Sequence, residues 1–142
     1  MADIDDLAAT FGQVVAAINR RDLNAYSNIW HDQIVAFGPF SPFPVDGKAT
    51  LRQGAEANLA NVESLTATPI NPQCRVIGNT GIVWGHLSIA LKPKDGPSRA
   101  VFERFTFTFA KVEGKWQEVA AHASLLPSAT NRQWRAEWSH RT

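Results

Sequence analysis

Apolar residues recur every three or four positions in the first part of the chain. This spacing predicts an amphipathic helix over residues 3–19, whose apolar stripe consists of Leu7, Phe11, Val14, Val15 and Ile18. Asp22 is a suitable N-cap for a second, short helix. A third helix is predicted over residues 48–61, directly after the turn signal Asp46-Gly47.

From residue 65 onwards the pattern changes to a period of two. Phe105, Phe107 and Phe109 alternate with Thr106 and Thr108, which indicates a strand with one buried face. Turn signals separate the apolar runs, and the predicted strands are residues 34–37, 65–78, 82–91, 100–112 and 116–126. Helices therefore precede a run of antiparallel strands, a pattern typical of an α+β fold in which helices cover one face of a sheet.

Residues 38–44 form a loop, because three prolines in seven residues exclude both a helix and a central strand. Phe40 and Phe43 lie in this loop. Two aromatic rings in a surface loop indicate that it covers something apolar, either a ligand pocket or one end of the core.

Composition excludes several classes of protein. The chain has 142 residues, enough for one domain, and no apolar run approaches the ~20 residues of a membrane span. The formal net charge of +1 argues against a nucleic-acid partner. The acidic beginning lacks the basic region of a signal peptide, so we expect a cytoplasmic protein.

Cys74 is the single cysteine, so neither an internal disulfide nor a cysteine-based zinc site is possible. It lies in a strand-like run without an obvious base nearby, which favours an apolar filler over a nucleophile. The four histidines are scattered, and the sequence predicts no metal site and no cofactor.

Three motifs, in this order, resemble the nuclear transport factor 2-like superfamily. They are the link Asn19–Leu23 followed by Trp30-His31-Asp32, the sequence Asp46-Gly47-Lys48, and the final strand that runs from Gly114-Lys115-Trp116 to His122-Ala123-Ser124. The chain is most similar to the SnoaL-like and ketosteroid isomerase-like branch, and also to the association domain of calmodulin-dependent kinase II. The resemblance implies a cone-shaped fold over residues 1–127, with helices on a strongly curved sheet, a pocket at its open end, and dimers formed through the convex sheet face.

A tail, residues 128–142, lies outside the resemblance. Trp134 and Trp138 stand one helical turn apart in it, which suggests a short helix that docks its indoles on the body or on a partner.

Ketosteroid isomerase itself is a poor match at its catalytic positions. The positions of its tyrosine, its catalytic base and its oxyanion-hole aspartate fall on Val14, Gly38 and Phe105 of this chain. None of these side chains can move a proton or hold an oxyanion, so the resemblance does not carry that mechanism over.

Two other residues are candidates for acid–base chemistry. Glu103 shares the inward phase of Phe105, so it either points into the cone with a raised pKa or lies at the strand edge beside Arg99 or Arg104. Tyr26, together with Trp30, either lines the pocket mouth or packs as an ordinary helix aromatic.

Strand alternation and the resemblance together predict a mostly apolar pocket. Its expected lining is Trp30, Phe37, Phe40, Phe43, Phe105, Phe107, Ala121 and Ala123. The expected face of a homodimer, on the convex side of the sheet, is Trp84, His86, Trp116 and His122.

Three functions fit these patterns. The first is the binding of a small apolar molecule in the cone by a homodimer of unassigned activity. The second is an isomerase, cyclase or dehydratase with Glu103 or Tyr26 as its acid–base group. The third is a protein-assembly module that uses the sheet face and the tail.

Overall fold

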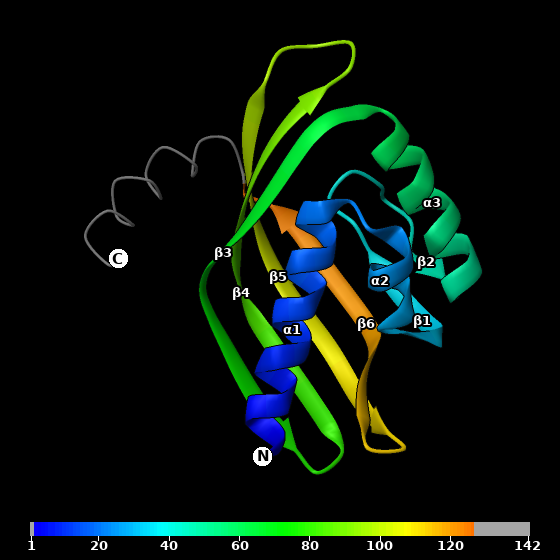
Figure 1. The fold of residues 1–142 in the computed structure, drawn as a ribbon, viewed down its shortest axis with the longest axis vertical. Coiled ribbons are helices and arrows are strands. Elements are labelled where there is room, and N and C mark those ends of the chain that lie inside the picture. Colours follow the sequence, from blue (N-terminus) through cyan, green and yellow to red (C-terminus); the bar gives the residue numbers. More distant parts are fainter. Residues whose placement is uncertain (1, 127–142) are drawn as a thin grey trace.

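A computed structural model of the chain describes residues 2–126 and confirms the α+β architecture. One six-stranded sheet in the order β2-β1-β6-β5-β4-β3 is covered by the helices on one face (Figure 1). In chain order the elements are α1 (Asp3–Arg20), α2 (Leu23–Asn28), β1 (Trp30–Phe37), β2 (Val45–Asp46), α3 (Lys48–Ala60), β3 (Val62–Ile77), β4 (Thr80–Pro93), β5 (Arg99–Val112) and β6 (Lys115–Leu125). All neighbouring strands pair antiparallel except β1 and β6, which are parallel.

Helix α1 packs its apolar stripe across the concave face of the sheet. Leu7 and Val14 are fully buried, and the ring of Phe11 stacks on Phe105 of β5 with centroids 5.4 Å apart. Burying each of these side chains contributes about 1.5–3 kcal/mol, which is sufficient to fix the face of the helix that meets the sheet. The interior of the cone beneath these residues of α1 is therefore filled by packed side chains.

Side-chain hydrogen bonds fix both ends of the turn between α1 and α2. The Asn19 side-chain amide donates to the Ala67 carbonyl (3.0 Å), and its oxygen accepts from the Ala67 N–H (2.7 Å). The carboxylate of Asp22 caps α2 by accepting from the Ala25 N–H at 3.0 Å, as its sequence position predicts. These contacts set the angle at which α2 leaves α1 and carries its side chains over the sheet.

A bulge in β6 changes which side chains face the cone. Thr108 of β5 pairs with Ala120, but Phe109 pairs with Glu118, so Val119 is an extra residue in β6. Ahead of the bulge Trp116 and Glu118 face inwards, and after it Ala121 and Ala123 do. Strict alternation fails at this point.

Trp116 is consequently not on the convex face, where the sequence pattern had placed it. It is 5% exposed, belongs to the core and donates its indole N–H to the Asp3 carbonyl at 3.2 Å. Trp84, His86 and His122 do lie on the outer face, because their paired neighbours Thr106 and Arg104 also point outwards.

Other differences from the sequence prediction are small. The short strand β2 was missed, since two residues carry no periodic signal, and β1 begins four residues earlier than expected.

The predicted tail with Trp134 and Trp138 lies outside the described residues. Within residues 2–126, none of the helices is sufficiently long and apolar to span a membrane.

Candidate functional site

The concave face of the sheet and the three helices border a cavity of about 440 Å³ that is open to solvent on one side. Its walls are apolar or aromatic for the most part, and they include Trp30, Leu87, Ile89, Phe107, Ala121 and Ala123. A smaller hollow of about 300 Å³ adjoins it, and Tyr26, Phe40 and Glu103 line both. The combined space is of the size that small-molecule sites usually have.

Helix α3 forms the outer wall of this cavity and is held in place by Arg52. The guanidinium of Arg52 donates to the Ser27 hydroxyl at 2.5 Å and to the Asn24 side-chain oxygen at 2.6 Å, both on α2. Leu51, Ala55 and Asn58 of α3 line the cavity. The cavity wall therefore depends on a polar contact between two helices, although α3 contributes no fully buried residue of its own.

Two carboxyl groups converge on the cavity from neighbouring strands. Glu118 of β6 is 1% exposed and Glu103 of β5 is 5% exposed, and both line the cavity. The backbone N–H of Glu118 donates to the Ile29 carbonyl at 2.8 Å, and Glu118 pairs with Trp30 in the sheet, so β1 holds it beside α2. Among the described residues, no hydrogen-bond partner reaches either carboxyl oxygen of Glu118.

Burial raises the pKa of both groups. Loss of hydration raises the pKa of Glu118 to about 8 and that of Glu103 to about 7. Near neutral pH Glu118 is therefore mainly protonated, and Glu103 is close to its midpoint. Groups poised in this way can donate and accept protons without large changes of pH.

Tyr26 is the third ionisable group of the site. Burial, and then the nearby Glu118 and Glu103, raise the pKa of its hydroxyl, while a hydrogen bond from Trp30 lowers it to a smaller extent. The Tyr26 and Trp30 rings meet edge to face, with centroids 4.7 Å apart. Tyr26 thus remains a protonated hydrogen-bond donor in the cavity.

Most of the expected lining residues come together here. Trp30, Phe40, Phe107, Ala121 and Ala123 border the cavity, as does Phe37. Phe37 lies at its rim, however, because its side chain is 43% exposed and its ring lies 5.4 Å from that of His122 on the outer face.

Two expected lining residues are elsewhere. Phe105 points inwards but stacks on Phe11 in the core beneath α1, so it does not border the cavity. Phe43 is 73% exposed, because the proline-rich loop turns back at Ser41 and directs it into solvent; the Phe43 N–H donates to the Ser41 hydroxyl at 3.3 Å.

Sequence reasoning treated the two glutamates differently. Glu103 was a candidate, and the structure places it in the interior instead of at an edge beside arginine. Glu118 was missed, since it was taken as part of a motif and not as a site residue. The strand pattern gave no signal for it, because strict alternation from Ala121 and Ala123 places Glu118 on the outer face and only the bulge at Val119 turns it inwards.

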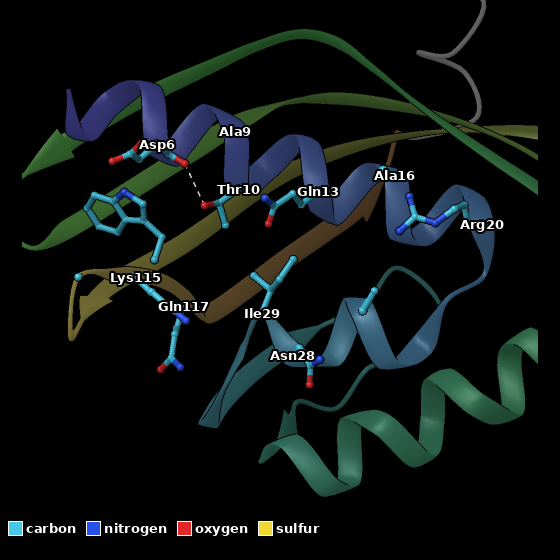
Figure 2. Close-up of a pocket in the computed structure, with 13 residues that line it drawn as sticks. Asp6, Ala9, Thr10, Gln13, Ala16, Arg20, Asn28, Ile29, Lys115 and Gln117 are labelled. Carbon is cyan, nitrogen blue, oxygen red and sulfur yellow. Dashed lines mark hydrogen bonds between the residues drawn. The ribbon is translucent and has the colours of Figure 1, made fainter. Parts of the chain in front are cut away.

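A separate hollow, of about 740 Å³, lies between α1 and the turn that joins β5 to β6 (Figure 2). Its polar lining includes Gln13, Arg20, Asn28, Lys115 and Gln117, whose side chains lie along the surface. The Thr10 hydroxyl there donates to the Asp6 carbonyl at 2.9 Å. Its charged groups are hydrated, so the cone cavity, with its buried carboxyl groups, is the better candidate site.

Metal binding finds no support in the geometry of residues 2–126. No three histidine, cysteine, aspartate or glutamate side chains gather there as a metal ion requires. Burial raises the pKa of the Cys74 thiol, which is the opposite of what an activated nucleophile needs.

Comparison with known proteins places this geometry in a family. A model of the SnoaL-like domain matches residues 7–128. A search of curated proteins found no match.

Several solved structures share the fold. A protein of Streptomyces avermitilis, provisionally named a dehydratase of the nuclear transport factor 2-like family, has a TM-score of 0.80 at 18% identity, with 89% of this chain and 97% of that one covered. A provisionally named calcium/calmodulin-dependent protein kinase II association domain from Xanthomonas campestris has a TM-score of 0.78 at 19% identity, covering 90% and 91%. A provisionally named scytalone dehydratase from Novosphingobium aromaticivorans has a TM-score of 0.78 at 10% identity, covering 88% and 85%.

Identities this low establish the shared fold and not an activity. The family model spans most of the chain, and the cone and its cavity have the shape that the fold provides. The chain belongs to the SnoaL-like family.

Proposed function

We propose that the chain binds a small, mainly apolar molecule in the cone cavity and catalyses a proton transfer on it. The observation that carries this proposal is the pair Glu103 and Glu118, two buried carboxyl groups with pKa values of about 7 and about 8 in one cavity. Burying each of them lowers stability, and a role in the chemistry of the cavity would account for this cost.

The geometry supports a division of labour between acid and base. Glu103, near its midpoint at neutral pH, accepts a proton in its ionised form, while protonated Glu118 and Tyr26 donate hydrogen bonds or a proton. The two carboxyl groups are buried among apolar walls, and the low polarity around them strengthens each of these interactions. Isomerisation and dehydration both need a proton removed at one atom and supplied at another, which agrees with the dehydratase names of two structural neighbours.

Loss of either glutamate should abolish turnover. We expect Glu103→Gln and Glu118→Gln each to reduce the rate at least ~100-fold, the usual contribution of general acid–base catalysis. The measurement is deuterium incorporation from solvent into a panel of small apolar carbonyl compounds, including aminoketones, followed by NMR.

Glu56→Gln is the matched control, because Glu56 is exposed on α3 and lies outside the cavity lining. Its rate should equal that of the wild type. Exchange that persists in both cavity variants would show that the two carboxyl groups do not perform the chemistry.

We also propose that the chain acts as a homodimer through the convex face of the sheet. Trp84, His86 and His122 lie on this face, and Val35 and Phe37 of the adjoining β1 are 41% and 43% exposed. The Arg75 guanidinium lies over the Trp84 ring, 5.1 Å from its centroid, which leaves an aromatic and basic surface of the kind found in interface cores.

Charge introduced on this face should separate the subunits. We expect a dimer for the wild type and a monomer for Trp84→Glu in sedimentation velocity at micromolar concentration, because a carboxylate in an interface core is costly to bury. Ile4→Glu, at an exposed position of α1, should remain dimeric. A monomeric wild type would contradict the proposal.

A further inference from the structure

The cavity contains a buried carboxyl group, that of Glu118, for which the described residues provide no hydrogen-bond donor. Glu118 is 1% exposed, and neither of its oxygens has a hydrogen-bond partner among the described residues. Buried polar groups are nearly always paired, and an unpaired one costs about 1–3 kcal/mol. An unpaired carboxyl group that lines a cavity therefore indicates that the ligand itself supplies the hydrogen-bond partner.

The remaining lining narrows the chemistry of that partner. Among the described residues that line the 440 Å³ cavity, none is lysine, arginine or histidine. Arg21 borders only the smaller hollow, together with Asp22, and its guanidinium donates to the Val62 carbonyl at 3.0 Å. An anionic ligand would face two carboxyl groups with no compensating charge, so the cavity disfavours carboxylates and phosphates.

The aromatic walls favour a cation. Tyr26, Trp30 and Phe107 line the cavity beside the glutamates, and Phe40 borders it from the proline-rich loop. The faces of aromatic rings attract ammonium groups, most strongly where water is excluded. An ammonium group would also provide the hydrogen-bond donors that the Glu118 oxygens lack.

We propose that the ligand of the cone cavity is a small apolar amine, bound as its ammonium ion, with Glu118 as its anchoring partner and the aromatic rings around it. This inference rests on the proposed use of the cavity as a ligand site. Glu118 lines only the larger space, whereas Glu103 stands where the two hollows adjoin. Glu118, ionised by the bound ammonium group, therefore acts as its anchor. Glu103 remains free as the base of the proton transfer, and with an amine bound the acid is the protonated hydroxyl of Tyr26.

The proposal predicts a distinctive dependence on pH. The ionisable groups that share the cavity with Glu118 are Tyr26 from α2 and Glu103 from β5, and Asn58 of α3 is a neutral polar residue of the lining. An ammonium ion stabilises ionised Glu118, so amine binding releases a proton below about pH 8, and affinity rises with pH. A neutral ligand that accepts a hydrogen bond from protonated Glu118 would bind less well as pH rises through the same range.

The experiment uses matched probes on the full chain. Primary amines from benzylamine to 4-phenylbutylamine are titrated calorimetrically between pH 6 and pH 8, beside the alcohol and the carboxylate of each carbon skeleton. We expect amine affinity to rise at least ~10-fold over this range, with proton release detected in buffers of different ionisation enthalpy. Amines should exceed alcohols at least ~10-fold at pH 7.5, carboxylates should not bind, and Glu118→Gln should remove the preference for amines.

Two results would overturn the inference. If alcohols bind as well as amines, and more weakly as pH rises, the ligand is neutral and the cavity remains a ligand site with its proposed proton transfer. If no compound of the panel binds in the cavity, the amine is excluded; the deuterium-exchange assay then decides separately whether the proton-transfer proposal survives. The wild-type pH profile keeps the test valid even if Glu118→Gln folds poorly.

Discussion

Replacing Glu118 by glutamine is expected to flatten the dependence of stability on pH. In the wild type, burial raises the pKa of Glu118 from 4.5 to about 8, so the folded chain keeps this proton over a range in which the unfolded chain has lost it. The folded state binds more protons, and its stability therefore falls as pH rises through this interval. Below about pH 4.5 the benefit is fully present, and above about pH 8 it is lost.

The size of this effect is large for so small a domain. Each unit of pKa difference corresponds to about 1.4 kcal/mol, so Glu118 alone changes the free energy of unfolding by on the order of 5 kcal/mol. Typical domains have ~5–15 kcal/mol in total. Glu103, with its pKa raised to about 7, adds to the fall in the same direction.

Urea denaturation at a series of pH values from 5 to 9 measures the effect. Glu118→Gln should match the wild type near pH 5 and exceed its stability at pH 9, since the amide cannot ionise. Glu103→Gln should remove a smaller share of the slope, and the exposed control Glu56→Gln should remove none of it. Parallel curves for the wild type and Glu118→Gln would show that Glu118 ionises normally in the folded protein.

Substitution of Gly85 by alanine is expected to destabilise the fold strongly. Gly85 has a φ of 155°, a conformation that residues with a side chain rarely adopt. It lies opposite the bulge of β3, and a Cβ built on it would stand 3.2 Å from the carbonyl oxygens of Ile70 and Asn71 and from the Cα of Pro72. Backbone strain of about 1–3 kcal/mol adds to a steric cost of about 1–3 kcal/mol.

Gly12→Ala provides the contrast. Gly12 lies within α1, and a Cβ there meets nothing within 4 Å, so alanine should stabilise the chain by up to ~1 kcal/mol through helix propensity. Chemical denaturation of both variants at pH 6 tests the pair. Wild-type stability in Gly85→Ala would mean that the β3 bulge relaxes freely, and that the curvature of the sheet does not depend on this glycine.

The elements of the fold were largely predictable, because their signals are local. The stripe of Leu7, Phe11 and Val14 specifies a helix with one buried face, and the alternation of Phe105 to Phe109 specifies a half-buried strand. The Asp22 cap was readable for the same reason, since its hydrogen bond joins residues three apart.

The site was predictable only in part. Most wall residues and Glu103 follow from the alternation of single strands, which is a property of the sequence. Phe105 and Phe43 were misplaced because their surroundings depend on how α1 and the proline-rich loop pack, which no periodicity records.

By itself the sequence determined an α+β chain with an apolar, aromatic-walled interior and one acid, Glu103, either inside the cone or at the strand edge. Only the tertiary structure places a second acid, Glu118, in the same cavity as Glu103. Val119 is an extra residue only in relation to β5, and the resulting bulge turns Glu118 inwards together with Ala121. A bulge arises from the pairing of two strands, so a pattern along one strand does not reveal it.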